Sequence, residues 1–293
     1  MARWAYVNGQ YVPRSMASVS IEDRGYQFAD GIYEVCLVLN GKFWDLDGHL
    51  ARMEYSLGEL SIAAPMSSRS LLSVMDELLK RNRLTNALVY IQVTRGVWRR
   101  NHVFPPAYLP SSLVMTASRF CLDDSDERAA KGVSVITQPD IRWGRADIKT
   151  ISLLPNVLAK QVANSAGASE VWLMRDGIIT EGGASNAWII DKKGALITHP
   201  KSHEILGGIT RQTVLACAAD MQIPVFERSF TLDEALGAQE AFLTSATNLV
   251  MPVVQVDAAL VGRGEPGPVT TRLRAAYKER AKIEAESSCK LRP

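Results

Sequence analysis

Apolar residues in the first third of the chain occur in short runs bounded by turn residues, a pattern typical of strands. Asn-Gly pairs lie between two such runs at residues 8–9 and 40–41, which is the strongest short-range signal for a β-hairpin. Farther on, apolar residues recur every three or four positions in two stretches and predict two helices. The expected elements are hairpins at 4–12 and 32–44, helices carrying Leu50 to Leu60 and Leu71 to Leu79, and strands at 87–94 and 113–117.

The second half of the chain also mixes strand and helix patterns, but not in the strict alternation of a doubly wound sheet. A polar stretch at 123–128 follows the first group of elements, so we expect a domain boundary just before it. This gives a small N-terminal domain over residues 1–120 and a C-terminal domain over 121–293. The expected C-terminal elements are a strand at 133–137 that continues toward Lys149, a helix at 154–166, hairpins turning at 176–177 and 193–194, and helices at 210–221 and 269–283.

Composition is that of an ordinary globular protein and removes several classes of function. With 293 residues, 47% of them hydrophobic, the chain is long enough for two cores. The formal net charge of +2 predicts no general attraction to nucleic acid or to an anionic membrane. No apolar run reaches the roughly 18 residues of a spanning helix, and the first residues lack the apolar region of a signal peptide. The four cysteines are far apart, which disfavours a disulfide or a metal site and favours the cytoplasm.

Lys149 is the first candidate for covalent chemistry. If residues 141–151 form one strand, Lys149 shares its parity with the apolar Ile141 and Trp143 and would point inward. A buried lysine loses its proton readily and suits Schiff-base formation, whereas a bulge in this segment would leave it on the surface. Lys160 is a competitor, but it lies on a predicted helix, where lysines usually face solvent.

A carboxylate and two polar segments complete the candidate constellation. Glu181 follows a hairpin strand at a Gly-rich turn, where it could cap the turn or hydrogen-bond the nitrogen of a heterocycle. The Gly pair before Thr210 opens a helix whose N–H groups could bind a phosphate, unless Thr210 merely caps that helix. Arg100 and His102 lie two apart in a loop, so they could grip a carboxylate together or form a solvated loop. A lysine that carries an aldehyde and a carboxylate that keeps a ring nitrogen protonated are what pyridoxal phosphate requires.

A set of ordered motifs resembles the fold-type IV pyridoxal-phosphate aminotransferases. The resemblance extends from about Trp4 to Tyr277 and covers nearly the whole chain. It begins with the segment from Ile21 to Glu34, which is similar to the opening signature of that family. The other motifs, in the family's order, are Val93-Thr94-Arg95-Gly96, Asp147-Ile148-Lys149, Thr180-Glu181-Gly182, Thr198-His199-Pro200, Gly208-Ile209-Thr210-Arg211 and Leu243-Thr244-Ser245.

The resemblance implies a fold, a cofactor and a set of residues that hold it. The implied fold is α+β, with a smaller N-terminal α/β domain and a larger C-terminal pseudo-barrel domain, and the implied cofactor is pyridoxal 5′-phosphate. Lys149 matches the catalytic residue that carries the cofactor as a Schiff base, and Glu181 matches the partner of the ring nitrogen. The other implied cofactor-binding residues are Arg52, Ile209 and Thr210 for the phosphate, Leu206 against the ring, and Ser245 and Ala246 in the phosphate loop.

Within the family, the chain is most similar to the D-amino-acid aminotransferases. Arg100-x-His102, together with Tyr33, matches the trap that holds the substrate α-carboxylate in those enzymes. There the arginine and histidine come from the other subunit, so the resemblance implies a homodimer. The implied reaction is transamination of D-amino acids with a 2-oxo acid, 2-oxoglutarate or pyruvate, by a ping-pong route through pyridoxamine phosphate. The alternatives are a branched-chain L-amino-acid or R-selective amine transaminase, an aminodeoxychorismate lyase, or a cofactor-binding protein without catalysis.

Two departures from the family pattern bear on how tightly the cofactor is held. The phosphate loop, often Thr-Ser-Thr-Thr in the family, reads Thr-Ser-Ala-Thr at residues 244–247 and lacks one hydroxyl. The turn after Glu181, serine-rich in the family, reads Gly-Ala-Ser at residues 183–185. We therefore expect weaker retention of the cofactor, with no catalytic group lost.

Overall fold

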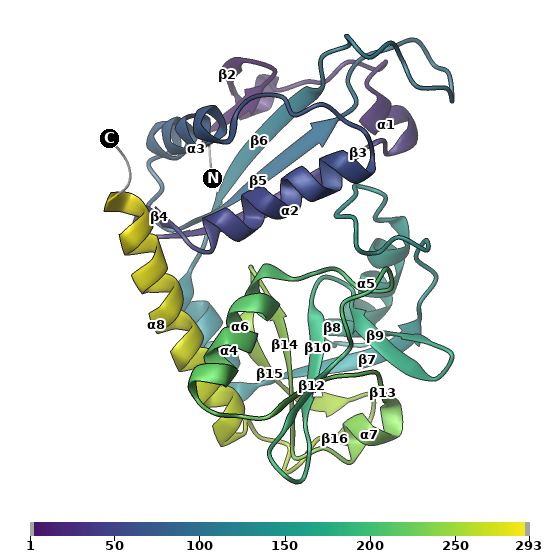
Figure 1. The fold of residues 1–293 in the computed structure, drawn as a ribbon, viewed down its shortest axis with the longest axis vertical. Coiled ribbons are helices and arrows are strands. Elements are labelled where there is room, and N and C mark those ends of the chain that lie inside the picture. Colours follow the sequence, from purple (N-terminus) through teal and green to yellow (C-terminus); the bar gives the residue numbers. More distant parts are fainter. Residues whose placement is uncertain (1–2, 291–293) are drawn as a thin grey trace. The chain divides into compact units, whose positions relative to one another are not determined.

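The computed structural model describes residues 3–290, which form two compact units (Figure 1). Unit 1 is built mainly from residues 3–121 and the short segment 148–152, and unit 2 from residues 122–147 and 153–288. The segment that contains Lys149 therefore belongs to unit 1, although it lies in the second half of the sequence. The domain boundary expected between residues 120 and 121 stays a prediction.

Unit 1 is one antiparallel sheet with two long helices. The strand order is β2-β1-β6-β5-β3-β4, and α2 packs on β3 while α3 packs on β1 and β6. Both expected hairpins are confirmed, and each Asn-Gly turn has the positive φ angles that these two residues tolerate best. The elements are β1 (Trp4–Val7), β2 (Gln10–Pro13), α1 (Arg24–Phe28), β3 (Gly31–Leu39), β4 (Lys42–Phe43), α2 (Leu46–Glu59), α3 (Ser68–Asn82), β5 (Ala87–Thr94) and β6 (Ser112–Arg119).

The core of unit 1 lies between the sheet and its two helices. On α3, Leu71, Met75 and Leu78 are fully buried, which is the helical spacing that the sequence predicts for that face. The inward residues of β3 and β5 pack against the same cluster. Strand β3 pairs with β5 continuously from Gly31 to Val38. This long pairing fixes the register of β3 and therefore the positions of its side chains.

Unit 2 is a ten-stranded mixed sheet with helices around it. Its main path is β12-β11-β10-β14-β15-β7-β8-β9-β13, and β16 pairs with β15. The elements are α4 (Leu122–Lys131), β7 (Val133–Pro139), α5 (Leu154–Ser165), β8 (Glu170–Arg175), β9 (Ile178–Gly182), β10 (Asn186–Ile190), β11 (Leu196–Thr198), α6 (Ile209–Asp220), β12 (Val225–Glu227), β13 (Phe230–Thr231), α7 (Leu232–Leu236), β14 (Glu240–Ser245), β15 (Leu249–Val256), β16 (Ala259–Leu260) and α8 (Pro268–Lys290).

The connection between β9 and β10 requires the sheet of unit 2 to curl. Four strands separate β9 from β10 in the sheet order, so a flat sheet would place them about 24 Å apart at the usual strand spacing. The chain from Gly182 to Asn186 has only four Cα steps and spans at most about 14 Å. The expectation of an α+β fold with a curled C-terminal sheet is therefore confirmed.

Two expectations about residues 141–151 are wrong, namely that they form a strand and that Ile141 and Trp143 point inward. Residues 141–151 do not form a strand: β7 ends at Pro139, and only a single bridge at Thr150 follows. Ile141 and Trp143, expected to point inward, are 64% and 44% exposed.

The polar stretch at 123–128 lies within α4, where four of the helix's charged residues fall in the first and last turns, as the helix dipole favours.

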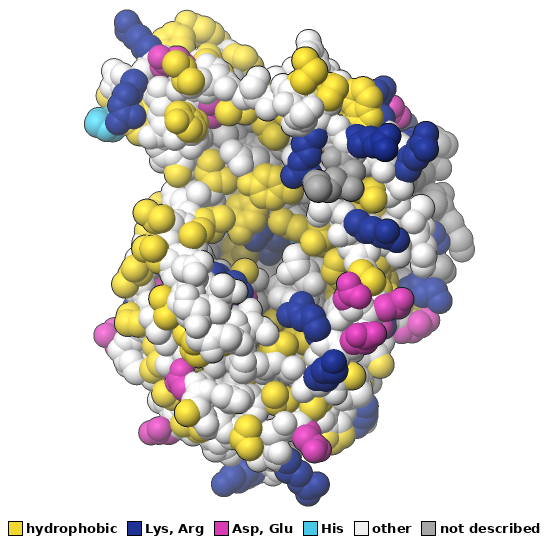
Figure 2. Space-filling model, turned by 180° about the vertical axis from the view of Figure 1, so that it is seen from behind, with side chains coloured by type: hydrophobic (Ala, Val, Ile, Leu, Met, Phe, Trp, Pro, Cys, Tyr) yellow, Lys and Arg dark blue, Asp and Glu magenta, His cyan; other side chains and the backbone are white. Residues whose placement is uncertain are grey.

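The surface carries charges of both signs without one dominant field. Figure 2 shows Lys and Arg side chains interspersed with Asp and Glu over the face that it draws. This agrees with the small formal net charge of +2. None of the helices within residues 3–290 combines the length and the apolar character that a bilayer crossing requires.

Candidate active site

Lys149 is held against the start of β3 in unit 1 by backbone hydrogen bonds. The carbonyl oxygen of Lys149 accepts a bond of 3.0 Å from the Tyr33 N–H, and its own N–H donates to Ser56 Oγ at 3.2 Å. Gly31 permits close packing on both sides of the strand, because a Cβ atom there would lie 3.1 Å from Ile151 Cδ1 in this segment and 2.6 Å from the Val93 carbonyl oxygen on β5. The segment is thus fixed by long-range contacts, and not by the strand alternation that the sequence pattern predicts.

The side chain of Lys149 faces an aromatic surface and is half-buried. Its Nζ lies 4.2 Å from the centre of the Tyr33 ring, which in turn stacks on Tyr90 at 5.7 Å. No carboxylate in the described part of the chain lies within ion-pair distance of this amine. The amine is therefore not committed to a structural salt bridge.

Lys160, the competitor, has structural partners in unit 2. Its Nζ lies 3.1 Å from a Glu170 carboxylate oxygen and donates to the Ser169 carbonyl oxygen at 2.9 Å. These contacts tie α5 to the start of β8. Lys160 thus has a role in stability that accounts for its position.

Arg52 forms a buried ion pair with Glu34 in unit 1. The guanidinium donates to both carboxylate oxygens at 2.7 and 2.8 Å, and His49 Nδ1 lies 2.8 Å from one of them. Burial alone would raise the pKa of Glu34, but the charge and hydrogen bonds of Arg52 and His49 hold it well below its ordinary value. His49 and Arg52 are three residues apart and share one face of α2. Glu34 and His49 were not predicted as site residues from the sequence; for His49, its spacing from Arg52 was the available signal.

Arg100 and His102 lie together on one aromatic ring of unit 1. The Arg100 guanidinium lies 4.6 Å from the centre of the Phe28 ring, and the His102 ring lies 5.4 Å from it. Arg24 fixes the same loop by donating to the carbonyl oxygen of Asn101. Both side chains are exposed, and within the described chain neither stacks on nor hydrogen-bonds Tyr33. The structure therefore brings Arg100 and His102 together, as expected. Within the described part of one chain, however, neither of them stacks on or hydrogen-bonds Tyr33.

Glu181 is a buried carboxylate in unit 2, at the end of β9. The Leu206 N–H donates to its two oxygens at 3.1 and 3.0 Å, and Asn186 Nδ2 donates to Oε2 at 2.9 Å. Arg142 Nη1 donates to Oε1. Burial, opposed by Arg142 and the Leu206 N–H, raises the pKa of Glu181 to about 7. Leu206, expected to pack against a ring, thus also orients the carboxylate through its backbone.

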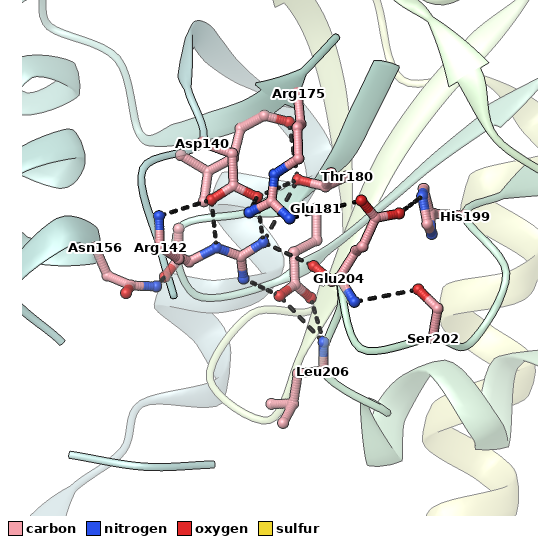
Figure 3. A network of polar contacts seen from close by, with 12 residues as sticks. Asp140, Arg142, Asn156, Arg175, Thr180, Glu181, His199, Ser202, Glu204 and Leu206 are labelled. Carbon is pink, nitrogen blue, oxygen red and sulfur yellow. Dashed lines mark hydrogen bonds and ion pairs between the residues drawn. The ribbon is translucent and has the colours of Figure 1, made fainter. Parts of the chain in front are cut away.

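Asp140 and Arg142 form the other half of this network (Figure 3). Arg142 Nε and Nη2 donate to the two oxygens of Asp140 at 2.9 and 2.8 Å. The Thr180 hydroxyl also donates to Asp140, at 3.0 Å. In a strand with Ile141 pointing inward, Arg142 would point outward, so Arg142 was not predicted as a site residue. In the structure, residue 142 lies in a loop that turns its side chain into unit 2.

The start of α6 is the candidate anion site of unit 2. The helix begins at Ile209 with Gly208 as N-cap, and no side chain in the described part of the chain caps it. Thr210 is therefore not the N-cap, which corrects one alternative from the sequence, and the first N–H groups remain for a ligand. Gly208 is required here, since a Cβ atom would lie 2.0 Å from Asn186 Oδ1.

Ser245 and Ala246 lie where β14 turns into β15. The Ser245 hydroxyl lies 3.2 Å from Thr247 Oγ1 and accepts from the Asn248 N–H at 3.1 Å. Ala246 is half-buried and adds no hydroxyl. The turn is thus ordered by its own hydrogen bonds.

The residues of the two units have the chemistry that pyridoxal phosphate needs. Unit 1 supplies a fixed arginine, Arg52, and an amine, Lys149, that pairs with no carboxylate among the described residues. Unit 2 supplies a buried carboxylate, Glu181, and the helix N-terminus at Ile209. A carboxylate with a raised pKa is poised to accept or give up a proton near neutral pH, as binding of a basic ring nitrogen demands.

Comparison with known protein sequences points to one family. A family model described as amino-transferase class IV matches residues 31–256. A D-alanine aminotransferase of Bacillus licheniformis is 41% identical over 271 residues, which cover 92% of this chain and 94% of that protein. A D-alanine aminotransferase of Staphylococcus haemolyticus is 38% identical over 283 residues, covering 97% and 99%.

Solved structures of the same architecture include branched-chain amino acid aminotransferases. One from T.th., with pyridoxamine 5′-phosphate, has a TM-score of 0.87 at 25% identity and covers 98% of this chain and 97% of that chain. One from Escherichia coli has a TM-score of 0.84 at 22% identity and covers 96% and 95%. The expected fold-type IV architecture is confirmed by these matches.

Proposed function

The chain belongs to the amino-transferase class IV family, and from this we propose that it transfers amino groups from D-amino acids to 2-oxo acids with pyridoxal phosphate. The observation that carries the proposal is the 41% identity, over 92% of this chain, to a protein called D-alanine aminotransferase. The structures with the same fold come from branched-chain enzymes, but at 22% and 25% identity they support the fold more than the substrate.

Lys149 is the proposed catalytic residue. Bound pyridoxal phosphate supplies an aldehyde that takes up an amino group and a ring that accepts electrons from the substrate α-carbon. With the cofactor bound, Lys149 Nζ would hold it in the resting enzyme. Once released, this nitrogen would act as the base that takes the substrate α-proton and then as the acid that gives a proton back. Its Nζ lies 4.2 Å from the centre of the Tyr33 ring, so the two proposed active-site residues of this part of unit 1 are neighbours.

The phosphate and the ring have separate proposed partners. For the phosphate these are the Arg52 side chain, the backbone and hydroxyl at Ile209 and Thr210, and the turn at Ser245 and Ala246. The first N–H groups of α6 support this role, since they favour an anion. For the ring nitrogen the partner is Glu181, whose burial and donors hold one carboxylate in a fixed direction.

Arg100 and His102, with Tyr33, are the proposed grip on the substrate carboxylate. We expect Arg100→Ala to raise the KM for D-alanine about 10- to 100-fold, because a charge-assisted bond to a carboxylate contributes about 1.5–3 kcal/mol. Steady-state kinetics over a range of D-alanine concentrations measures this. Arg99→Ala, one position away, is the matched control with little expected change. An unaltered KM for Arg100→Ala would contradict the grip.

We also propose that the enzyme is a homodimer in which Arg100 and His102 serve the partner's site. Their exposure in one chain and the lack of a contact with Tyr33 among the described residues support this. A second support is an apolar face on α5, where four side chains at helical spacing are between 45% and 69% exposed: Leu154, Val157, Leu158 and Val162. Figure 2 shows hydrophobic side chains on the surface at the level of α5. A second copy would cover such a face with its own, as twofold symmetry allows.

Mixed dimers test this arrangement. Lys149→Ala and Arg100→Ala subunits, each nearly inactive at low D-alanine, share one intact site when they pair. Random reassortment of equal amounts should restore roughly a quarter of wild-type activity, because half of the dimers carry one good site of two. If each site is made from one chain, mixing restores nothing.

A substrate screen tests the overall function. We expect turnover of D-alanine with 2-oxoglutarate or pyruvate, and little turnover of L-leucine or of an R-amine. A preference for L-leucine would favour the branched-chain alternative, and formation of pyruvate from aminodeoxychorismate without an acceptor would favour the lyase. The proposed location is the cytoplasm, in keeping with the wide spacing of the four cysteines along the sequence.

A further inference from the structure

Arg142 makes more hydrogen bonds than any other side chain that contacts Glu181. Its side chain is 7% exposed, although it stands in a loop after β7. It donates to Asp140 through Nε and Nη2, to the Glu204 carbonyl oxygen at 2.9 Å and to Glu181. All of these residues belong to unit 2. A guanidinium held at this many points has one orientation.

The network is organised around the two carboxylates. Figure 3 shows Arg142 between Asp140 and Glu181, and each carboxylate receives a different part of its fork. Asp140, with a fully buried side chain, also receives the Thr180 hydroxyl and lies 3.3 Å from Arg175 Nη2. Asp140 thus anchors Arg142 from behind, and Arg142 presents its remaining nitrogen to Glu181.

The charges of this network favour a further cation near Glu181. Two buried carboxylates share one buried cation, Arg142, since Arg175 is 28% exposed and also pairs with Glu204. Without Arg142, Glu181 would face the like charge of Asp140 in a buried site and would take up a proton. The charged groups that act on Glu181 are Arg142, which favours its ionised form, and Asp140, which opposes it. With Arg142 in place, the excess negative charge is met by a protonated ring nitrogen.

We propose that Arg142, anchored by Asp140, is a positioning residue for the reaction: it aims the Glu181 carboxylate and keeps it charged, so that Glu181 can hold a proton on the cofactor's ring nitrogen. The inference rests on the proposed function, since it needs Glu181 to meet that nitrogen. In the proposed arrangement, Arg142 itself touches neither the cofactor nor the substrate. Its effect on catalysis is carried entirely by Glu181.

A comparison of two cofactors isolates this effect. The probes are pyridoxal phosphate and its analogue in which a C–H group replaces the ring nitrogen. Cofactor-free wild type should bind pyridoxal phosphate at pH 8 at least tenfold more tightly than the analogue. Arg142→Met should lose most of that preference, by weakening pyridoxal phosphate about tenfold while leaving the analogue within twofold. Equilibrium dialysis measures both dissociation constants without any turnover.

The controls separate electrostatics from structure. Arg175→Met removes a cation that also contacts Asp140 but not Glu181, and should keep the wild-type preference. Arg142→Lys keeps a charge without the fork and should give an intermediate preference; it carries the test if Arg142→Met does not fold. If Arg142→Met weakens both cofactors equally, or neither, or if Arg142→Lys keeps the full preference, the proposal is overturned.

Glu181→Gln distinguishes failure of this inference from failure of the proposed function. If wild type shows no preference between the two cofactors, or if Glu181→Gln keeps it, Glu181 does not meet the ring nitrogen and the assignment under the proposed function fails. If Glu181→Gln abolishes the preference and Arg142→Met keeps it, only the role of Arg142 is wrong.

Discussion

Lys149→Ala should lower transamination of D-alanine by between about a hundredfold and ten-thousandfold, the range that a positioned proton carrier contributes. The loss has two causes, since this residue both attaches the cofactor and moves the α-proton. The variant should also lose the visible absorption of the Schiff base, and borohydride should no longer fix the cofactor to the chain. Absorption spectra and mass spectrometry after reduction measure these effects apart from turnover.

Lys160→Ala is the matched control for this prediction. Lys160 bonds to Glu170 and to the Ser169 carbonyl oxygen, so its loss should lower stability by about 1 kcal/mol or less and leave the spectrum unchanged. A Lys149→Ala protein that still turns over D-alanine at the wild-type rate, or in which borohydride still fixes the cofactor, would refute the assignment. If Lys160→Ala instead bleaches the spectrum, the roles of the two lysines are reversed.

Local patterns in the sequence predict most of the fold. Turn chemistry predicts the hairpins at Asn8-Gly9 and Asn40-Gly41. The spacing of apolar residues over neighbouring helical turns predicts the helices α2, α3 and α6. The same patterns miss α4, because its surface is nearly all polar, with Ser125 and Ala129 as its buried residues. A helix that buries only small side chains leaves little periodic signal.

The placement of Lys149 could not be predicted from its own segment. Strand alternation suggests an inward lysine for a reason that the structure contradicts, because residues 141–147 are a loop. What fixes the segment is a set of contacts over a sequence separation of about 119 residues, such as the bond from Thr150 Oγ1 to the Gly31 carbonyl oxygen. The family resemblance predicts the role of this lysine, because a family pattern reflects such long-range pairing, which a local pattern does not contain.

The network around Glu181 illustrates the same limit for charged groups. Asp140 and Arg142 are two residues apart, and in the sequence they resemble a solvated loop. Their proposed role depends on Glu181, about 40 residues away, and on the Leu206 N–H that reaches it from a third segment. A buried charge network therefore becomes visible only once its segments are folded together.

Glu181→Gln should stabilise the cofactor-free protein at pH 8 and yet impair the enzyme. In the folded chain the pKa of Glu181 is raised from 4.5 to about 7, so between these values the folded state binds more protons than the unfolded state. Its contribution to stability is complete below about pH 4.5 and is lost as the pH rises through about 7, at a total cost of about 3 kcal/mol. Glutamine does not titrate, so the variant should gain relative to wild type over this window.

Denaturant unfolding of the cofactor-free proteins at pH 5 and pH 8 measures the expected difference. At pH 5 the variant should be more stable by about 1 kcal/mol or less, and at pH 8 by a few kcal/mol. Glu204→Gln, which changes a 44% exposed acid of the same network, should shift stability by less than about 0.5 kcal/mol at either pH. Added pyridoxal phosphate should stabilise wild type more than the variant, because the stabilisation by a ligand grows as its dissociation constant falls. Turnover of the variant should fall about a hundredfold or more, as loss of a preorganised charge at the ring predicts. Equal stability of variant and wild type at both pH values would mean that Glu181 is ionised without cost, and that its charge does not depend on the cofactor.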